Sequence, residues 1–406
     1  MNINRFTLPN GLRFVHCYHT SPVAYCGLSI NAGSRDEKAT ENGLAHLSEH
    51  MLFKGTRRRS ASAINNRLEN VGGELNAFTT KEETVVHATV LKSDLNKAVE
   101  LLADIVFRST FPDRELVKEK EVIADEINVY LDNPSELIFD DFDRWLFAGS
   151  SLGKPILGTP KSLAGITTAK LKAFVAQHYR PSQVVFSTVA KVSAKRMEQL
   201  AVKYLSEFPA VDARYERKAP AAYKPFQKTL KRNAFQAHCI IGNRAYSLND
   251  PRRTGLALLV NYLGGPAANS RLNTLLREQN GLVYVSDATY TPYDDCGTVT
   301  LYFGADKASL NQCVDLIQKE LASLRTKAFG VAQLHRIKKQ LLGQLLISAD
   351  NAEAQMLGNA KSIMTYNDVE TFEQLKAKID ALTAGELQDI VNEIFAPECL
   401  STLIYV

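Results

Sequence analysis

The sequence contains few cysteines and no paired cysteine motif. Six cysteines are spread over 406 residues, and no two of them are separated by two residues, as they are in many zinc and redox sites. This scarcity excludes a small disulfide-stabilised scaffold and predicts reduced thiols, as in cytoplasmic proteins. The sequence also lacks an apolar run of the ~18–20 residues that cross a membrane, so neither a membrane-spanning protein nor a membrane partner is expected.

The sequence also lacks a strong net charge of either sign. The formal net charge is +4, with 23% charged and 45% hydrophobic residues, which is typical of a globular protein. A nucleic-acid partner is not expected, because such proteins carry a strongly basic face with interleaved aromatic residues. The first eleven residues lack the features of a secretory signal and of a transit peptide. The expected location is therefore the cytoplasm.

Two short patterns occur twice in the chain at nearly the same offset. The tripeptide Gly43-Leu44-Ala45 recurs 212 residues later at Gly255, each time after a strand-like run. The pattern of Leu171, Val175 and Pro181 recurs 216 residues later. A helix cannot continue through this proline, and a β-rich run follows it in both copies. These repeats predict a chain of two similar halves.

The segment that joins the halves has the composition of a linker. It contains three prolines between Glu207 and Leu230 and has no apolar periodicity, as is typical of extended connections. We therefore expect a first domain over 1–210 and a second domain over 225–406, joined by a linker over 211–224.

The spacing of hydrophobic residues predicts the main helices and strands. Helical periodicity predicts helices over 42–53, 98–107, 113–131, 312–324 and 331–347. Shorter β-rich runs predict strands over 24–33, 85–91, 184–189, 237–242, 297–303 and 400–406. The expected fold class is α+β, with two similar domains that each consist of a sheet with helices packed on one side.

The residues most typical of catalysis lie on one predicted helix of the first half. His46, Glu49 and His50 fall on a different stripe of this helix from its apolar residues. Residues three and four apart are neighbours on a helix, so two imidazoles can reach one ion with a carboxylate beside them. This HxxEH arrangement is the reverse of HExxH, and both are zinc-peptidase signatures. An incidental surface cluster is the alternative interpretation.

A catalytic zinc ion needs three protein ligands and an open position for water. The predicted helix over 113–131 offers Glu119 and Glu126, which are seven residues apart and share its apolar face. A carboxylate on a buried apolar face is costly unless it is paired or bound to a cation, so a metal site would account for both. The alternative is a pair of glutamates at a wet rim of the helix, and periodicity does not decide which one binds metal.

A set of motifs extends from this helix along almost the whole chain. They are His46-Leu-Ser-Glu-His50 with Met51-Leu-Phe-Lys-Gly-Thr56, Gly72-Gly-Glu-Leu-Asn76-Ala-Phe-Thr79, Glu119 to Ile127, Pro155-Ile-Leu-Gly158, Tyr179-Arg-Pro181, Ser270-Arg-Leu272 and Arg277 to Tyr284. Together they resemble the pitrilysin/insulysin family of zinc peptidases with an inverted motif. Within it, the chain is most similar to the small two-domain bacterial branch that resembles the catalytic subunit of mitochondrial processing peptidase.

The resemblance implies a ligand set and its supporting residues. The family's third zinc ligand lies 76 residues after the second histidine, which is Glu126 here, so His46, His50 and Glu126 are the implied ligands of one Zn²⁺ per chain. Glu119 matches the family's additional catalytic glutamate, which is implied to support the ligands rather than bind the metal. Glu49 is implied to be the general base that takes a proton from zinc-bound water and passes it to the leaving amine.

The second half lacks these metal ligands. The positions that correspond to the HxxEH residues are Leu258, Asn261 and Tyr262, so a single zinc ion per chain is expected. This half instead carries Arg277 and Tyr284, which match the family's substrate-holding arginine and tyrosine. By themselves the two residues would be unremarkable, and their catalytic and substrate-binding roles are implied by the resemblance.

The resemblance also implies how peptides bind. Asn76, Ala77 and Phe78 match the family's edge strand, to which a substrate pairs as an added strand. In the family two bowl-like halves of two domains each enclose the peptide, so this chain would form half of a chamber and would need a partner. A homodimer is expected, and a heterodimer with a related subunit is the alternative.

The predicted function is that of a zinc-dependent endopeptidase or oligopeptidase that cleaves extended, unfolded peptides. A non-catalytic core or assembly subunit of the same fold is the main alternative, and the intact His46, Glu49, His50 and Glu126 argue against it. A metal-dependent hydrolase of a non-peptide substrate is the second alternative. Zinc content and cleavage of a quenched peptide would separate the three.

Overall fold

The computed structural model describes residues 3–211 and 216–406 and contains two compact units. Each unit is built from segments that are not contiguous in the sequence. The first comprises Met1–Asn128, Lys154–Arg217 and Ile347–Thr371, and the second comprises Val129–Gly153, Lys218–Leu346 and Phe372–Val406. The units thus differ from the domains expected over 1–210 and 225–406 by two exchanged segments. Part of the expected linker, residues 212–215, lies outside the described residues.

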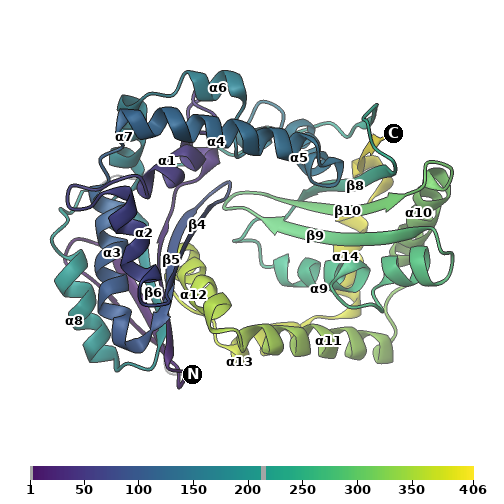
Figure 1. Cartoon of the computed structure of the whole chain (residues 1–406). Helices are drawn as coiled ribbons and strands as arrows, with labels where there is room; N and C mark the ends of the chain where they lie inside the picture. Colours follow the sequence, from purple (N-terminus) through teal and green to yellow (C-terminus); the bar gives the residue numbers. More distant parts are fainter. Residues whose placement is uncertain (1–2, 212–215) are drawn as a thin grey trace. The chain divides into compact units, whose positions relative to one another are not determined.

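The first unit contains a six-stranded sheet with the order β1-β2-β6-β3-β5-β4. Figure 1 labels its strands β4, β5 and β6. Its strands are β1 (Ile3–Thr7), β2 (Arg13–Tyr18), β3 (Val23–Ile30), β4 (Glu74–Thr79), β5 (Thr84–Leu91) and β6 (Val184–Ala190). Strands β2 and β6 are parallel, and the other neighbouring pairs are antiparallel. Strand β4 therefore forms one edge of this sheet.

Helices from the first half cover one face of this sheet. They are α1 (Leu44–Leu52), α2 (Ala61–Glu69), α3 (Leu95–Arg108), α4 (Asp113–Leu131), α6 (Pro160–Ala164), α7 (Thr168–His178) and α8 (Ala194–Leu205). The alternate strand residues Leu28, Val86 and Phe186 pack with the helices in one hydrophobic core. Burial of such apolar surface supplies most of the stabilisation of the fold, at about 25 cal/mol per Å².

A helix from the second half covers the opposite face of the first sheet. Helix α12 (Ala352–Tyr366) packs on β3 and β6. It lies so close that a Cβ atom on Gly27 would be 3.1 Å from Met356 Sδ, and Ser187 Oγ donates a hydrogen bond of 2.7 Å to the Met356 carbonyl. The expectation that helices cover one side of each sheet is therefore incomplete.

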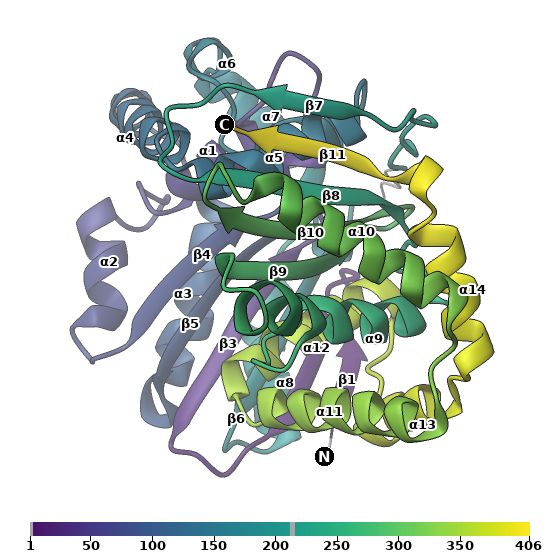
Figure 2. The ribbon, with the colours of Figure 1, turned by 90° about the vertical axis from the view of Figure 1, so that its right-hand side faces the viewer.

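The second unit contains a five-stranded sheet with the order β7-β11-β8-β10-β9, which Figure 2 shows face on. Its strands are β7 (Gln227–Leu230), β8 (Ala237–Ala245), β9 (Val283–Pro292), β10 (Gly297–Ala305) and β11 (Ser401–Tyr405). Its helices are α5 (Pro134–Leu146), α9 (Arg253–Gly264), α10 (Leu310–Thr326), α11 (Val331–Ala349), α13 (Phe372–Ala381) and α14 (Ala384–Ile394). Strand β11 pairs in parallel with β7 and antiparallel with β8.

The second sheet is also covered on both faces, on one of them by a helix from the first half. Ile241 packs with the core that includes α9, α10 and α14, whereas the adjacent Ile240 packs with α5, a helix from the first half. A Cβ atom on Gly242 would lie 2.9 Å from Phe142 Cζ on α5, much as Gly27 accommodates α12. One helix from each half of the chain thus packs on the sheet of the other half.

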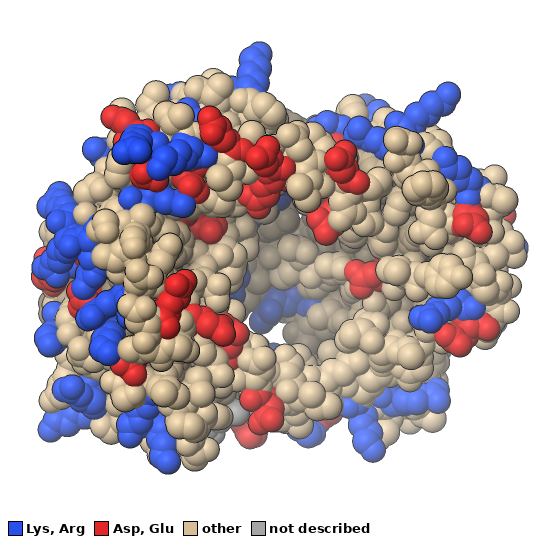
Figure 3. All heavy atoms as spheres, viewed as in Figure 1, with Lys and Arg blue, Asp and Glu red and all other residues tan. Residues whose placement is uncertain are grey.

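The predicted α+β fold class with two sheet-and-helix units is confirmed. All predicted helices and strands are present, and their ends differ from the predictions by a few residues. Among the described residues, no helix is both long and apolar enough to cross a lipid bilayer. On the face seen in Figure 3, Lys and Arg side chains are interspersed with Asp and Glu, in keeping with the small net charge.

Candidate metal centre

The helix that carries the HxxEH residues has a buried carboxylate at its start. Glu37 Oε2 accepts hydrogen bonds from the Gly43 backbone N–H at 3.0 Å and from Asn42 Nδ2 at 3.2 Å, and its Oε1 accepts from the Ala45 backbone N–H at 2.8 Å. A carboxylate here pairs with otherwise unsatisfied N–H groups and with the positive end of the helix dipole. Burial nevertheless raises the pKa of Glu37 to about 7. The sequence did not predict this role, because Glu37 lies seven residues before Leu44, outside the cap and first-turn positions where a polar or acidic residue signals the start of a helix.

Two glycines explain why α1 begins at Leu44 rather than at 42. Gly43 has a φ of 90° and Gly158 a φ of 77°, a left-handed conformation that favours glycine. A Cβ atom on Gly43 would lie 2.7 Å from the Leu157 carbonyl oxygen, and one on Gly158 would lie 2.6 Å from the Asn42 carbonyl oxygen. The Pro155 to Gly158 motif therefore packs backbone to backbone against the start of the HxxEH helix and fixes its position.

His46, His50 and Glu126 converge on one point. Each offers one potential ligand atom, and the three atoms lie within 4.8 Å of one another. Glu126 Oε2 is 3.9 Å from His46 Nε2 and 3.8 Å from His50 Nε2. Within the described ranges, this is the one group of three or more His, Cys, Asp or Glu residues that could hold a metal ion.

The chemistry of these donors fits zinc. Bonds of ~2.0–2.1 Å in a tetrahedral zinc site place ligand atoms ~3.3–3.4 Å apart, which is less than the 3.8 and 3.9 Å between Glu126 and the two histidines, so a bound ion would draw the three side chains slightly closer together. Burial, and next the neighbouring His50, lower the pKa of His46 to about 4, so His46 is neutral at pH 7 and has a lone pair for a metal. His46 Nδ1 is buried and has no hydrogen-bond partner in the described part of the chain.

The two glutamates of α4 differ in burial. The side chain of Glu119 is 7% exposed, and it lies on the buried stripe with Leu116 and Ile123. The side chain of Glu126 is 44% exposed, and Val122 on the same side is exposed as well. The prediction that Glu126 lies on a buried face was therefore wrong, because the buried stripe of α4 is narrower than the periodicity suggested. The wet-rim alternative describes Glu126.

Glu119 lies beside the metal group without belonging to it. Its Oε2 is 3.1 Å from His50 Nδ1, and its Oε1 is 2.7 Å from Lys54 Nζ. An imidazole that donates from Nδ1 to a carboxylate keeps Nε2 free for a metal. The structure thus places Glu119 where it can orient His50 while Glu126 faces both histidines.

Glu49 is held next to the metal group by the edge strand. Thr79 Oγ1, at the end of β4, donates a hydrogen bond of 2.7 Å to Glu49 Oε2. Burial raises the pKa of Glu49, whereas the Thr79 hydrogen bond and His50 act to lower it. Thr79 ends one of the family motifs, but the sequence does not predict this role, because its partner Glu49 lies 30 residues away.

The residues predicted to bind substrate in the first unit lie on strand β4. Asn76 and Phe78 are exposed and Ala77 is half-buried, and β4 pairs with β5 along one side only. The main-chain groups along the other side can therefore accept an added strand. The Phe78 ring packs against His87 of β5 with 6.2 Å between centroids.

Arg277 and Tyr284 lie in the second unit, and both are accessible there. Arg277 belongs to a π-helical turn, η5 (Asn273–Glu278), and its side chain is 53% exposed and 3.9 Å from Glu278. Tyr284 lies on β9 and is 81% exposed. Leu258, which corresponds to His46, is buried in α9. The metal group and the Arg277–Tyr284 pair therefore belong to different compact units.

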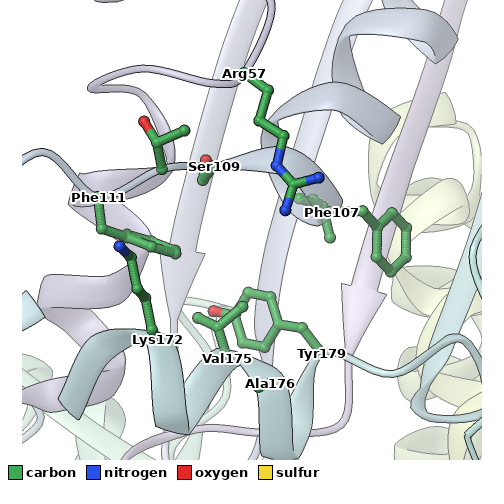
Figure 4. Close-up of a pocket in the computed structure, with 10 residues that line it drawn as sticks. Arg57, Phe107, Ser109, Phe111, Lys172, Val175, Ala176 and Tyr179 are labelled. Atoms are coloured by element: carbon green, nitrogen blue, oxygen red, sulfur yellow. The ribbon is translucent and has the colours of Figure 1, made fainter. Parts of the chain in front are cut away.

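The first unit also contains a cavity of about 380 Å³ that includes none of the predicted site residues (Figure 4). Its lining residues lie after α1, at and directly after the end of α3, and in and directly after α7. They include Arg57, Phe107, Lys172 and Tyr179. The metal centre is therefore distinct from this cavity.

Comparisons with known proteins agree with this arrangement of two halves. Residues 14–160 match the family described as insulinase, peptidase family M16. Residues 165–341 match the peptidase M16 inactive domain. The second description agrees with the lack of metal-binding residues at the corresponding positions of the second half.

Similar proteins cover almost the whole chain. The uncharacterized zinc protease YmxG of Bacillus subtilis is 32% identical over 99% of this chain and 98% of that protein. An uncharacterized zinc protease of Mycobacterium leprae is 31% identical over 96% of this chain and 88% of that protein.

Solved structures share the fold. The peptidase M16 inactive domain from Pseudomonas fluorescens has a TM-score of 0.92 at 22% identity and covers 100% of this chain and 98% of its own. A protease from Helicobacter pylori has a TM-score of 0.91 at 19% identity and covers 100% and 99%. Taken with the matches in sequence, this likeness shows that the chain belongs to the insulinase (M16) family of peptidases.

Proposed function

We propose that this chain is a zinc-dependent endopeptidase or oligopeptidase that hydrolyses peptide bonds in extended, unfolded peptides. The observation that carries the proposal is the convergence of His46, His50 and Glu126 with the buried Glu49 beside them. A zinc ion held by these three residues supplies a Lewis acid for the scissile carbonyl and lowers the pKa of a water molecule.

Glu49 is the general base in this proposal. Thr79 fixes one oxygen of its carboxylate, which leaves the other oxygen to take a proton from the attacking water and to deliver it to the leaving amine. The raised pKa of Glu49 suits this role, because a base works best when its pKa lies near the operating pH. Glu119 keeps His50 in the orientation and tautomer that suit metal binding.

The free side of β4 is the proposed peptide-binding edge. A peptide that adds as a strand is held mainly by main-chain hydrogen bonds, which any extended sequence can make. Thr79 ends this strand and also contacts Glu49, so a peptide bound along Asn76 to Phe78 would reach the catalytic residues. This geometry favours unfolded substrates over folded proteins.

We also propose a homodimer in which each catalytic centre combines residues of two chains. The metal group would come from one protomer, and Arg277 and Tyr284 would come from its partner, where they are exposed and available. Arg277 would donate to a peptide carbonyl, and Tyr284 would donate to the developing oxyanion. Family membership supports this arrangement, and a heterodimer with a related subunit is the alternative.

Glu126→Gln is expected to remove zinc from the purified chain. The amide is a weaker ligand than the carboxylate, and the loss of a direct ligand should exceed the ~10–100-fold cost in affinity of losing a supporting group. Elemental analysis with a quenched-peptide assay measures the effect, and Glu121→Gln, an exposed position on the same helix, is the control. Full zinc occupancy in Glu126→Gln would exclude Glu126 from the ligand set.

Glu119→Gln is expected to be milder, with a loss of ~10–100-fold in zinc affinity or activity. The glutamine amide can still accept a hydrogen bond from Lys54 or from His50. It cannot accept from both through separate oxygens, because it has only one oxygen. Chelator sensitivity of the Glu119 and Glu126 variants decides between the two roles. If Glu119→Gln released zinc more readily than Glu126→Gln, the roles would be reversed.

A further inference from the structure

Lys54 lies two residues beyond the end of the HxxEH helix. It is connected to His50 of the metal group through Glu119, which contacts both residues. Its Nζ is 2.7 Å from Glu119 Oε1, with its side chain 28% exposed. The other oxygen of the same carboxylate is 3.1 Å from His50 Nδ1, and His50 Nε2 faces Glu126 at 3.8 Å. The contacts thus run in a line from Lys54 through Glu119 to His50.

We propose that Lys54 is a positioning residue for the metal centre, an inference that rests on the proposed zinc site. A carboxylate has two oxygens that can turn toward any donor nearby. Because Lys54 holds Oε1, Oε2 of Glu119 stays directed at His50 Nδ1. A hydrogen on Nδ1 leaves the lone pair of Nε2 for the metal, so the tautomer and the ring orientation of His50 are set by this contact.

The surroundings of Glu119 explain why a cation is needed there. Glu119 lies on a buried stripe between Leu116 and Ile123, where an unpaired carboxylate would be costly. Lys54 compensates this charge when no metal is bound. It also keeps Glu119 outside the group formed by His46, His50 and Glu126, so it helps to assign one glutamate to the metal and the other to His50.

The test is the zinc affinity of the full-length chain, measured by competition with a chromophoric chelator. Lys54→Met, which keeps the length of the side chain but removes the charge, is expected to weaken zinc binding ~10–100-fold. Lys118→Met is the matched control, because Lys118 forms an exposed ion pair of 2.8 Å with Glu115 on the same helix as Glu119. This control is expected to bind zinc like the wild type.

A double variant shows whether Lys54 acts through Glu119. If it does, Lys54→Met combined with Glu119→Gln should bind zinc about as weakly as Glu119→Gln alone, because residues in one network are not additive. The melting temperature of the metal-free chain separates a loss of fold from a loss of positioning. Should Lys54→Met fail to fold, Lys54→Gln, which can still donate to Glu119, takes its place with a smaller expected loss.

Two results would overturn the inference. One is zinc binding by Lys54→Met that equals or exceeds that of the wild type, as expected if charge repulsion between Lys54 and the metal dominated. The other is an additive loss in the double variant. A wild-type chain that binds no zinc would instead overturn the proposed function, and this inference with it.

Discussion

Glu49→Gln is expected to lower kcat by ~10²–10⁴-fold, the usual contribution of a general base, while zinc content stays that of the wild type. Glutamine has the shape of glutamate, and its carbonyl oxygen can still accept the Thr79 hydrogen bond. It has no carboxylate to take a proton from water. Since Glu49 is buried, with a raised pKa, a neutral replacement is not expected to destabilise the chain.

Three measurements on the same preparation check this expectation. They are kcat with an unstructured quenched peptide, zinc by elemental analysis, and the melting temperature. Glu121→Gln, at an exposed position of α4, is the control for the chemical change alone. Turnover within a few-fold of wild type, with zinc retained, would mean that another group accepts the proton.

Complementation between two inactive variants is the second large expected effect. Tyr284→Phe should lose ~10²–10³-fold in kcat, as for other oxyanion donors, and Glu49→Gln is inactive for a different reason. If each centre takes its metal group from one protomer and Tyr284 from the other, a mixed dimer carries one intact centre. Random exchange of subunits in a two-fold dimer should therefore restore about a quarter of wild-type activity.

A second mixture controls for effects of exchange itself. Glu49→Gln and Glu126→Gln both damage the metal-binding half of the centre, so mixed dimers of these two variants contain no intact centre. Only the first mixture is expected to recover activity. Failure of both mixtures, with exchange shown by mass-tagged chains, would mean that each centre is built within one chain or with a different partner subunit.

The local part of the site could be predicted from the sequence. His46, Glu49 and His50 lie within one helical turn of each other, so their spacing alone places them together on α1. The edge position of Asn76 on β4 was implied by the family motif, and the sheet order bears it out. The first prediction depends on short-range helix geometry and the second on a motif. Both could be made without knowing how the helices pack.

Features that depend on tertiary packing could not be predicted. Periodicity placed Glu119 and Glu126 on one face, but only packing makes one buried and the other half-exposed. Glu37 stabilises the start of α1 through a loop whose path the sequence does not reveal. The sequence also does not predict that α5 covers the second sheet and α12 the first, because an amphipathic helix does not specify which sheet it will cover.

The most direct test of zinc-dependent peptide hydrolysis is to titrate the metal-free chain with Zn²⁺ while following cleavage of an unstructured quenched peptide. Activity is expected to rise with added zinc and to level off at one ion per chain, and Glu126→Gln is expected to stay inactive over the same range. Cleavage that persists after the metal is removed, or no cleavage by a fully loaded and folded chain, would contradict the proposed function.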